Sequence, residues 1–307
     1  MTSLVERIIR PEILALKAYP VVAPPPGVVK IDLMENPYRL PRELREELAQ
    51  VLAEVALNRY PVPSFTDLTA ELRTVMGIDA DLGVLLGNGS DDVLAMLTLA
   101  LARPGASVVA VEPSFPMYRM NAVYFGMKYV GVPLNADFSL NEAALLDAIA
   151  THQPALVWLA YPNNPTGNLY PVAAIERVLR AAPGVVAIDE AYFPFSGGAT
   201  FLTRVREFEN LILVRTLSKT GLAGVRLGFA VARPEWIVEL NKVRQPFNVN
   251  VLTEAAVTSE LVPIQVKGIV RAQLVRRVTD VLLRMRSTVF TRADLVQTVS
   301  TLGQAVS

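Results

Sequence analysis

Between residues 83 and 232 the sequence alternates short apolar runs with helical segments, and this alternation constrains the fold more than any other feature. The runs include "SVVAV", "ALVWLA", "VVAI" and "NLILV", which are apolar at nearly every position rather than at every second one. Such runs are typical of parallel strands buried on both faces, because the helices that connect parallel strands cover the sheet. The sequence therefore predicts an α/β fold with three layers, helix–sheet–helix, around a mostly parallel sheet.

The alternation predicts a division of the chain into three parts. Residues 1–35 form an N-terminal arm, since the proline-rich stretch "YPVVAPPPG" resists both helix and sheet. Residues 36–250 form a large domain, and residues 251–307 form a small, incomplete C-terminal α/β part. Hydrophobic residues make up 52% of the chain, which is enough for a sizeable core.

Composition excludes several classes of function. Lys+Arg and Asp+Glu both total 29, which argues against a nucleic-acid binder. The chain has no cysteine and one histidine, His152, so disulfides, thiolate metal sites and Ser-His-Asp chemistry are not expected, and no metal is predicted. The N-terminus lacks the pattern of a signal peptide, and no apolar run reaches the ~18 residues of a membrane span. We therefore expect a cytoplasmic protein that does not contact a membrane.

Polar residues follow several of the predicted strands. They form four groups: "GNGSDD" at 87–92, "YPNNPTG" at 161–167, "DEAY" at 189–192 and "TLSK" at 216–219. Ligands of open α/β sheets bind at the carboxyl ends of the strands, so we expect these groups to lie together. Taken singly, each also has a plain interpretation as a turn, a helix cap or a surface lysine.

Taken together, in this order and at these spacings, the four groups resemble the fold-type I pyridoxal-phosphate (PLP) enzymes of the class I/II aminotransferase family. The resemblance covers roughly residues 30 to 250. The motifs "MENPY", "NRYPVP", "AYPNNPTGN", "IDEAYFPF" and "RTLSKTGLAGVRLGFA" are most similar to the histidinol-phosphate aminotransferase subfamily. The resemblance implies transamination of L-histidinol phosphate with 2-oxoglutarate, in histidine biosynthesis, by a homodimer.

The resemblance also implies roles for the residues around the cofactor ring. Lys219 is the Schiff-base lysine, which then acts as a general base. Asp189 keeps the pyridine nitrogen protonated, so that the ring can act as an electron sink. Tyr192 and Asn164 hydrogen-bond the phenolic oxygen of the ring, and Tyr118 stacks on the ring.

Further residues match groups that hold the cofactor phosphate or the substrate. Backbone amides at a helix start, hydroxyl groups and a fixed cation would bind the phosphate, from Ser90, Asp91, Thr216, Ser218 and Arg226. Tyr60 resembles a tyrosine that reaches the phosphate from the neighbouring subunit. Tyr19, Glu35 and Asn36 are the predicted substrate-binding residues.

The C-terminal part departs from the family pattern. The family's later strand and its substrate-binding arginine motif are missing after "STVF". Either the C-terminus is truncated or frame-shifted, or a shortened enzyme recruits Arg284, Arg286 or Arg292 instead.

Three alternative functions remain open at this point. One is another fold-type I enzyme, such as a threonine-phosphate decarboxylase or an aromatic aminotransferase. Another is a PLP-binding homologue without turnover. The third is a nucleotide-binding Rossmann protein, although Asp92 stands where that fingerprint needs its third glycine.

Overall fold

The structure is a computed structural model that describes residues 3–18, 33–36 and 39–259. The chain divides into two compact units, one of residues 1–34 with 271–307 and the other of residues 35–270. In the first unit, the described residues form helices α1 (Leu4–Ile8) and α2 (Pro11–Leu14). The proline-rich arm at 19–32 and the C-terminal residues 260–307 lie outside the described residues, so the three-part division stays a prediction.

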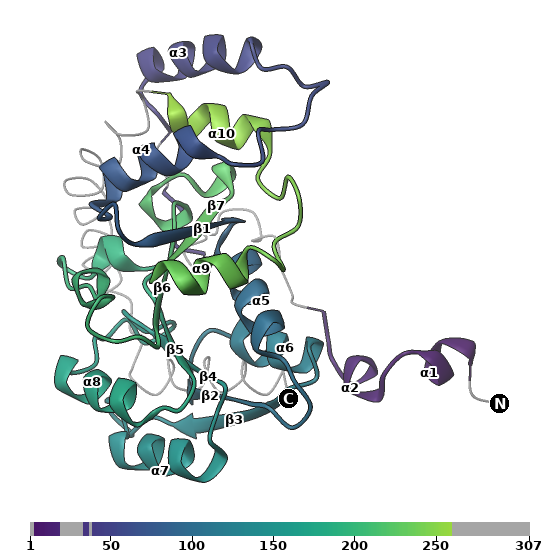
Figure 1. Cartoon of the computed structure of the whole chain (residues 1–307), viewed down its shortest axis with the longest axis vertical. Helices are drawn as coiled ribbons and strands as arrows, with labels where there is room; N and C mark the ends of the chain where they lie inside the picture. The colour runs from purple at the N-terminus through teal and green to yellow at the C-terminus, as the bar shows by residue number, and fades with distance from the viewer. Residues whose placement is uncertain (1–2, 19–32, 37–38, 260–307) are drawn as a thin grey trace, which may run out of the picture. The chain divides into compact units, whose positions relative to one another are not determined.

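The second unit is built on one seven-stranded sheet (Figure 1). Its strands lie in the order β1-β7-β6-β5-β4-β2-β3. Their bounds are β1 Gly83–Asn88, β2 Ser107–Glu112, β3 Lys128–Pro133, β4 Leu156–Ala160, β5 Val185–Asp189, β6 Leu211–Thr216 and β7 Leu227–Ala232. The strands predicted from the apolar runs between residues 83 and 232 are present, and the mostly parallel sheet is confirmed.

One strand runs against the others. β7 pairs antiparallel with both of its neighbours, β1 and β6, whereas the remaining pairs are parallel. The amino end of β7 therefore lies at the same edge of the sheet as the carboxyl ends of β1, β5 and β6. This reversal brings the residues just before β7 to the edge where ligands of such sheets bind.

Helices cover both faces of the sheet, since successive strand side chains point to opposite faces. On β2, Val109 and Val111 belong to one buried cluster, and Val108 and Ala110 belong to the other. Helices that contribute to the first cluster are α4 (Thr66–Met76), α7 (Glu142–His152), α8 (Val172–Ala181) and α10 (Val251–Thr258). Helices that contribute to the second are α5 (Ser90–Leu101), α6 (Met117–Tyr124) and α9 (Pro234–Leu240). The three predicted layers are therefore confirmed.

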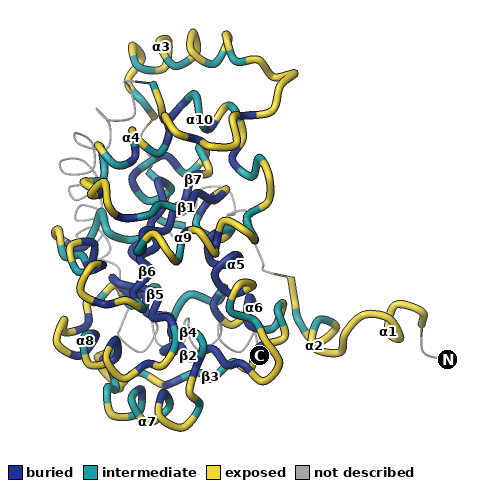
Figure 2. The backbone as a smooth tube through the Cα atoms, in the orientation of Figure 1, coloured by how far each residue is buried: buried dark blue, intermediate teal, exposed yellow. Residues whose placement is uncertain are grey.

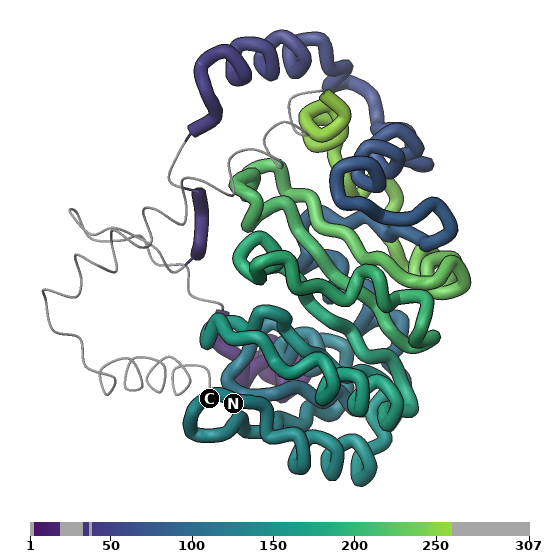
Figure 3. The backbone as a smooth tube through the Cα atoms, turned by 90° about the vertical axis from the view of Figure 1, so that its left-hand side faces the viewer, coloured from purple at the N-terminus to yellow at the C-terminus, as the bar shows by residue number. Residues whose placement is uncertain are grey.

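The burial pattern agrees with this layering. Figure 2 shows the strands as mostly buried, whereas α3 (Arg42–Ala53) is exposed along most of its length and has no buried residue. Gly77 ends α4 in the left-handed conformation, at φ 65°. Helix α10 contacts both α3 and α4, and Figures 1 and 3 show it beside α4. Although residue 251 begins the predicted small part, α10 thus packs within the second unit.

The described residues of the second unit also include four short 3₁₀ helices. They are Phe193–Phe195, Leu202–Arg204, Ser218–Thr220 and Ala223–Val225. The first two lie in the connection from β5 to β6, and the last two lie in the connection from β6 to β7.

Candidate active site

The strand register lines up the four polar groups at one edge of the sheet, because Ala160, which ends β4 before "YPNNPTG", lies opposite Asp189. Asp189, the last residue of β5, lies opposite Val214 of β6. Thr216, the last residue of β6, lies opposite Gly228 of β7, and Leu227 lies opposite Asn88, which ends β1. The groups after β1, β5 and β6 therefore meet, as the sequence predicts.

Two glycines allow the chain to pass closely at the start of α5. A Cβ atom on Gly228 would lie 2.2 Å from the backbone nitrogen of Ser90, so only glycine fits under this turn. A Cβ atom on Gly89 would lie 2.4 Å from Nη2 of Arg226, and Gly89 has a φ of 85°. The guanidinium of Arg226 therefore rests against the turn from β1 to α5.

The start of α5 and the neighbouring Arg226 form a corner of the site that can bind an anion. Ser90 and Asp91 begin α5, and the amides of a first helical turn have no partners within the helix. Arg226 adopts a left-handed backbone conformation at φ 55°, which is uncommon for a residue with a side chain. Its guanidinium lies 3.9 Å from the Asp91 carboxylate, and the Arg226 side chain is 45% exposed. The amides and the cation thus face the same space, and a ligand can still reach the cation.

Hydroxyl groups lie beside this corner. The Thr216 Oγ1 atom donates to the carbonyl oxygen of Leu227 over 3.1 Å and lies 3.0 Å from the Ser218 Oγ atom. The backbone amide of Ser218 donates to Thr216 Oγ1 over 3.1 Å. These contacts fix the turn that carries Lys219 to the end of β6.

Lys219 is partly buried at this turn. Burial lowers the pKa of its ammonium group, while the carboxylates of Glu35 and Asp91 raise it and Arg226 lowers it further. Its Nζ atom lies 5.6 Å from the centroid of the Tyr192 ring. The net lowering increases the neutral fraction of the amine, which is the nucleophilic and basic form.

Asp189 occupies the inner end of the site and is 5% exposed. Its Oδ1 atom accepts from the backbone amide of Ala191 over 2.9 Å, and its Oδ2 atom accepts from the Tyr118 hydroxyl over 2.8 Å. Burial raises the pKa of the carboxyl group to about 6, against the lowering effect of these two hydrogen bonds. A cation placed beside Asp189 would therefore be held strongly.

The position of Tyr118 does not support the predicted stacking role. Its ring is 1% exposed and stacks on the Trp158 ring, with centroids 4.9 Å apart and planes 4° apart. Such a ring has no open face to offer to a cofactor. The other aromatic residue of the motif "SFPMY", Phe115, is half-buried, and its ring packs edge-on against Tyr118 at 5.7 Å.

The two asparagines of "NNPTG" have different surroundings. Asn163 is buried, and its Nδ2 atom donates to the Pro113 carbonyl and to Thr166 Oγ1. Asn163 thus holds the turn together. Asn164, the predicted cofactor-binding residue, is half-buried and is joined to Pro165 by a cis peptide bond.

A buried ion pair next to the site was also missed by the sequence analysis. Arg215 donates to Glu190 Oε2 from Nε over 3.0 Å and from Nη2 over 2.8 Å. The guanidinium carbon of Arg215 lies 3.9 Å from the Phe193 ring centroid. The sequence signal was a charged residue beside each of two apolar runs, Arg215 within β6 and Glu190 directly after β5, since buried charges are costly unless they are paired. The pair ties the strand ends that carry Asp189 and Thr216.

Two of the predicted substrate-binding residues, Glu35 and Asn36, lie near Lys219 or the loop after it. Asn36 lies against the loop after Lys219, because a Cβ atom on Gly221 would lie 2.8 Å from its Nδ2 atom. Glu35 is close enough to influence Lys219 electrostatically. Tyr19 and the arginines at 284, 286 and 292 lie outside the described residues. Tyr60 is 79% exposed, and its ring stacks on Phe247 at 4.5 Å.

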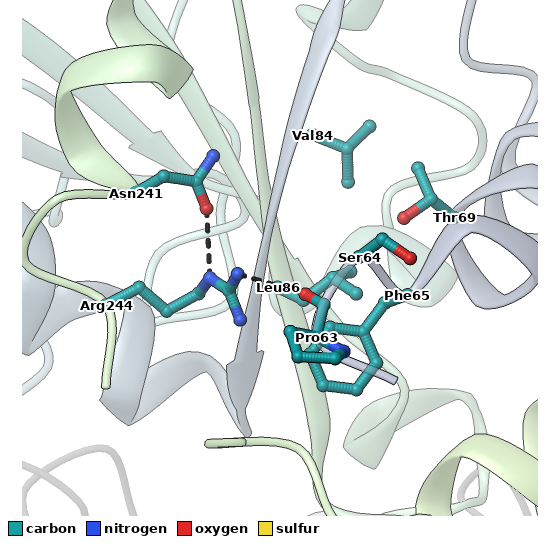
Figure 4. A pocket seen from close by; sticks show the side chains of 8 residues that line it. All are labelled: Pro63, Ser64, Phe65, Thr69, Val84, Leu86, Asn241 and Arg244. Atoms are coloured by element: carbon teal, nitrogen blue, oxygen red, sulfur yellow. Dashed lines mark hydrogen bonds between the residues drawn. The ribbon is translucent and has the colours of Figure 1, made fainter. Parts of the chain in front are cut away.

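A pocket elsewhere in the second unit is lined by none of the predicted site residues (Figure 4). Its volume is about 250 Å³, and Arg244 lies at one side, where it donates to Asn241 and to the Pro63 carbonyl. We place the candidate site at the sheet edge rather than here, because Lys219 and Asp189 lie there. Within residues 3–18, 33–36 and 39–259, no helix is long and apolar enough to cross a membrane.

Comparison with known proteins gives a consistent result. Residues 28–288 match the family described as aminotransferase class I and II. The chain is 54% identical over 277 residues to a histidinol-phosphate aminotransferase 2 of Cupriavidus pinatubonensis, covering 89% of this chain and 75% of that protein. The fold is similar to that of the histidinol-phosphate aminotransferase of Clostridium acetobutylicum, with a TM-score of 0.73, 20% identity and coverage of 84% and 77% of the two chains. It is also similar to a Sinorhizobium meliloti histidinol-phosphate aminotransferase in complex with pyridoxal-5'-phosphate, with a TM-score of 0.59, 22% identity and coverage of 85% and 75%.

Proposed function

This chain belongs to the class I and II aminotransferase family, and from that premise we propose how its residues carry out the reaction. The chain is a PLP-dependent aminotransferase that exchanges the amino group of L-histidinol phosphate with 2-oxoglutarate, in histidine biosynthesis. The observation that carries the assignment of roles is the meeting of Lys219, Asp189 and Arg226 at one edge of the sheet.

The residues at this edge fit the chemistry of pyridoxal phosphate. The cofactor presents an aldehyde, a ring nitrogen and a phosphate, and the edge presents an amine, a buried carboxylate and a corner of amides, hydroxyls and a cation. Asp189 is costly to bury as a carboxylate when no cation accompanies it, which fits a site that receives a protonated ring nitrogen. When bound, the cofactor supplies an electron sink for the electrons released from the substrate's C–H bond.

We propose the following division of work among these residues. The Lys219 amine would hold the cofactor through its aldehyde carbon, with water as the leaving group, and would accept and return the substrate proton once the substrate has displaced it. Tyr192 and Asn164 orient the phenolic oxygen of the ring, and Phe115, rather than Tyr118, covers the ring face. The phosphate is held by the amides of Ser90 and Asp91 and by the side chains of Thr216, Ser218 and Arg226. Glu35 and Asn36 lie where they can contact the substrate, and Tyr19 stays a proposed substrate contact.

We also propose that the enzyme works as a homodimer in the cytoplasm, with Tyr60 donated to the neighbouring subunit's phosphate. The strong exposure of Tyr60 supports this, as does that of Leu57 and Val62, since clustered apolar exposure is typical of interfaces. Co-expression of a Tyr60→Phe chain with a Lys219→Ala chain tests the arrangement. Mixed dimers should regain one site in which both residues are native, so the mixture should be more active than either variant alone. Activity no higher than that of the separate variants would refute a shared site.

Absorbance spectroscopy of the purified chain with PLP tests the reaction. Addition of L-histidinol phosphate should convert the visible cofactor band to that of the amine form, and phenylalanine should do so more slowly. Borohydride reduction followed by peptide mapping should place the cofactor label on Lys219. A label on another lysine would refute the assignment, and a band that does not move would refute turnover of this substrate by this chain.

A further inference from the structure

A stacked pair of aromatic rings lies directly behind Asp189. The Tyr118 hydroxyl, on α6, donates to Asp189 Oδ2 over 2.8 Å, and the Tyr118 ring lies parallel to the fully buried Trp158 ring, from β4. Phe115 packs edge-on against the same tyrosine. The tyrosine ring is thus fixed on two sides, so its hydroxyl points at one oxygen of the carboxylate.

The surroundings of Asp189 otherwise oppose its negative charge. Burial and the neighbouring carboxylates, Asp91 from α5 and Glu190 directly after β5, raise its pKa. Hydrogen bonds from Tyr118 and from the Ala191 amide lower it. Because Glu190 is itself paired with Arg215, its influence on Asp189 is partly neutralised. The Tyr118 hydroxyl is therefore the side-chain group that stabilises the charged form of Asp189.

Tyr118 can only donate to Asp189 at working pH. Its own pKa is raised well above the usual range, first by burial and then by the Asp189 charge. The hydroxyl therefore keeps its proton. Each carboxylate oxygen receives one hydrogen bond from the protein and retains a further lone pair, which leaves Asp189 able to accept from a ligand.

We propose that Tyr118, held against Trp158, is a positioning residue that keeps Asp189 ionised and thereby keeps the shared proton on the cofactor's ring nitrogen. The inference rests on the proposed role of Asp189 at that nitrogen. A hydrogen bond donated to a carboxylate makes it a weaker base, so the proton between Asp189 and the ring stays with the ring. The electron sink depends on that proton.

The variant Tyr118→Phe tests this, because it removes the hydroxyl and keeps the ring stack. In the full-length apo-protein, the Asp189 pKa followed by carboxyl ¹³C NMR should rise by about one to two units. In the holoenzyme, the ring nitrogen of ¹⁵N-labelled cofactor should move toward the chemical shift of a neutral pyridine. An unchanged pKa and an unchanged ¹⁵N shift would overturn the inference.

Tyr170→Phe is a matched control. Tyr170 is also buried, and its hydroxyl has no hydrogen-bond partner in the described part of the chain. Its loss should leave both readouts as they are in the unchanged protein. If Tyr170→Phe moved both readouts as far as Tyr118→Phe, a general packing effect would replace the proposed role.

The variant Asp189→Asn separates this inference from the proposed function. If the ¹⁵N shift is insensitive to Asp189→Asn, Asp189 does not lie at the ring nitrogen and the proposed function of that residue fails. If the shift responds to Asp189→Asn and not to Tyr118→Phe, the inference alone fails.

If Tyr118→Phe does not fold, 3-fluorotyrosine at position 118 keeps the shape of the side chain and donates a stronger hydrogen bond. The Asp189 pKa should then fall, and a pKa that does not fall would overturn the inference.

Discussion

The two ends of the active site are built in different ways. The buried end, formed by Asp189, Tyr118, Glu190 and Arg215, lies inside the sheet and helix layers, and each charged group has a hydrogen-bonded partner. The open end, formed by Ser90, Asp91, Thr216, Ser218 and Arg226, has a half-exposed cation whose nearest carboxylate is 3.9 Å away.

The difference separates what stabilises the fold from what binds the ligand. A buried ion pair is strongly coupled to folding, because loss of one member leaves the other charge in the interior. An exposed pair contributes little to stability, so its groups remain available to a ligand. We therefore expect changes at the buried end to alter the free energy of unfolding, and changes at the open end to alter cofactor affinity.

The largest expected effect is at the buried ion pair. Glu190→Gln should lower the free energy of unfolding by about 3–5 kcal/mol, because Arg215 loses its counter-charge in the interior. Urea unfolding of the apo-protein measures this. Glu46→Gln, which breaks the exposed pair with Arg42, is the control and should cost less than about 0.5 kcal/mol. Equal losses for the two variants would remove the contrast between the ends.

Removing the charge of Asp189 should raise the free energy of unfolding of the apo-protein, whereas removing the charge of Glu190 lowers it. Its folded pKa of about 6 lies above the ordinary value of 3.8 for an aspartate, so its contribution to stability is present below about pH 4 and is lost as pH rises through 6. Asp189→Asn should therefore stabilise the apo-protein by up to about 3 kcal/mol at pH 7.5, and give no such gain at pH 4.

Urea unfolding of the apo-protein at the two pH values tests this prediction. A loss of stability at pH 7.5 would show that the Asp189 carboxylate is stabilised in the fold even without a ligand.

At Arg226 we expect a large effect on PLP affinity and little effect on the free energy of unfolding. Arg226→Ala should raise the dissociation constant of PLP about tenfold to a hundredfold, since a charge-assisted bond to the phosphate is lost. The unfolding free energy of the apo-protein should change by less than about 0.5 kcal/mol. Arg233, which makes an exposed 3.8 Å pair with Glu235, is the control, and its alanine variant should leave PLP affinity as it was. A large loss of apo-protein stability in Arg226→Ala would show that Arg226 stabilises the fold, as the residues of the buried end do.

The smallest effect is expected for Asp91→Asn. We propose that Asp91 contributes its backbone amide rather than its side chain, so the PLP dissociation constant should change by less than about threefold. Equilibrium titration followed by cofactor absorbance measures this. A tenfold weakening would show that the carboxylate, through Arg226, is itself part of the phosphate site.

Much of the fold could be predicted from the sequence. Apolar runs such as "ALVWLA" identify strands regardless of their neighbours, and Gly77 marks the end of α4 locally. The order of the strands and the reversed direction of β7 could not be predicted, because they depend on pairing between distant segments.

For the site, the motifs identified the groups at the sheet edge but not their orientations. The spacing of "SFPMY" cannot say which aromatic ring faces the core, and the structure shows Tyr118 buried, stacked on Trp158 and hydrogen-bonded to Asp189. The buried Arg215–Glu190 pair depends on which strands are neighbours, so it too required the fold. The roles of the individual site residues in binding the cofactor stay predictions.

The reversed strand β7 also influences the order in which the site assembles during folding. Lys219 and Arg226 lie on one short connection between two adjacent antiparallel strands, and contacts between segments near in sequence close quickly. The Tyr118–Asp189 bond joins residues 71 positions apart, and β5 lies between parallel neighbours that need long crossovers. We therefore expect the refolding chain to form the lysine- and arginine-bearing hairpin early and to complete the carboxylate side late.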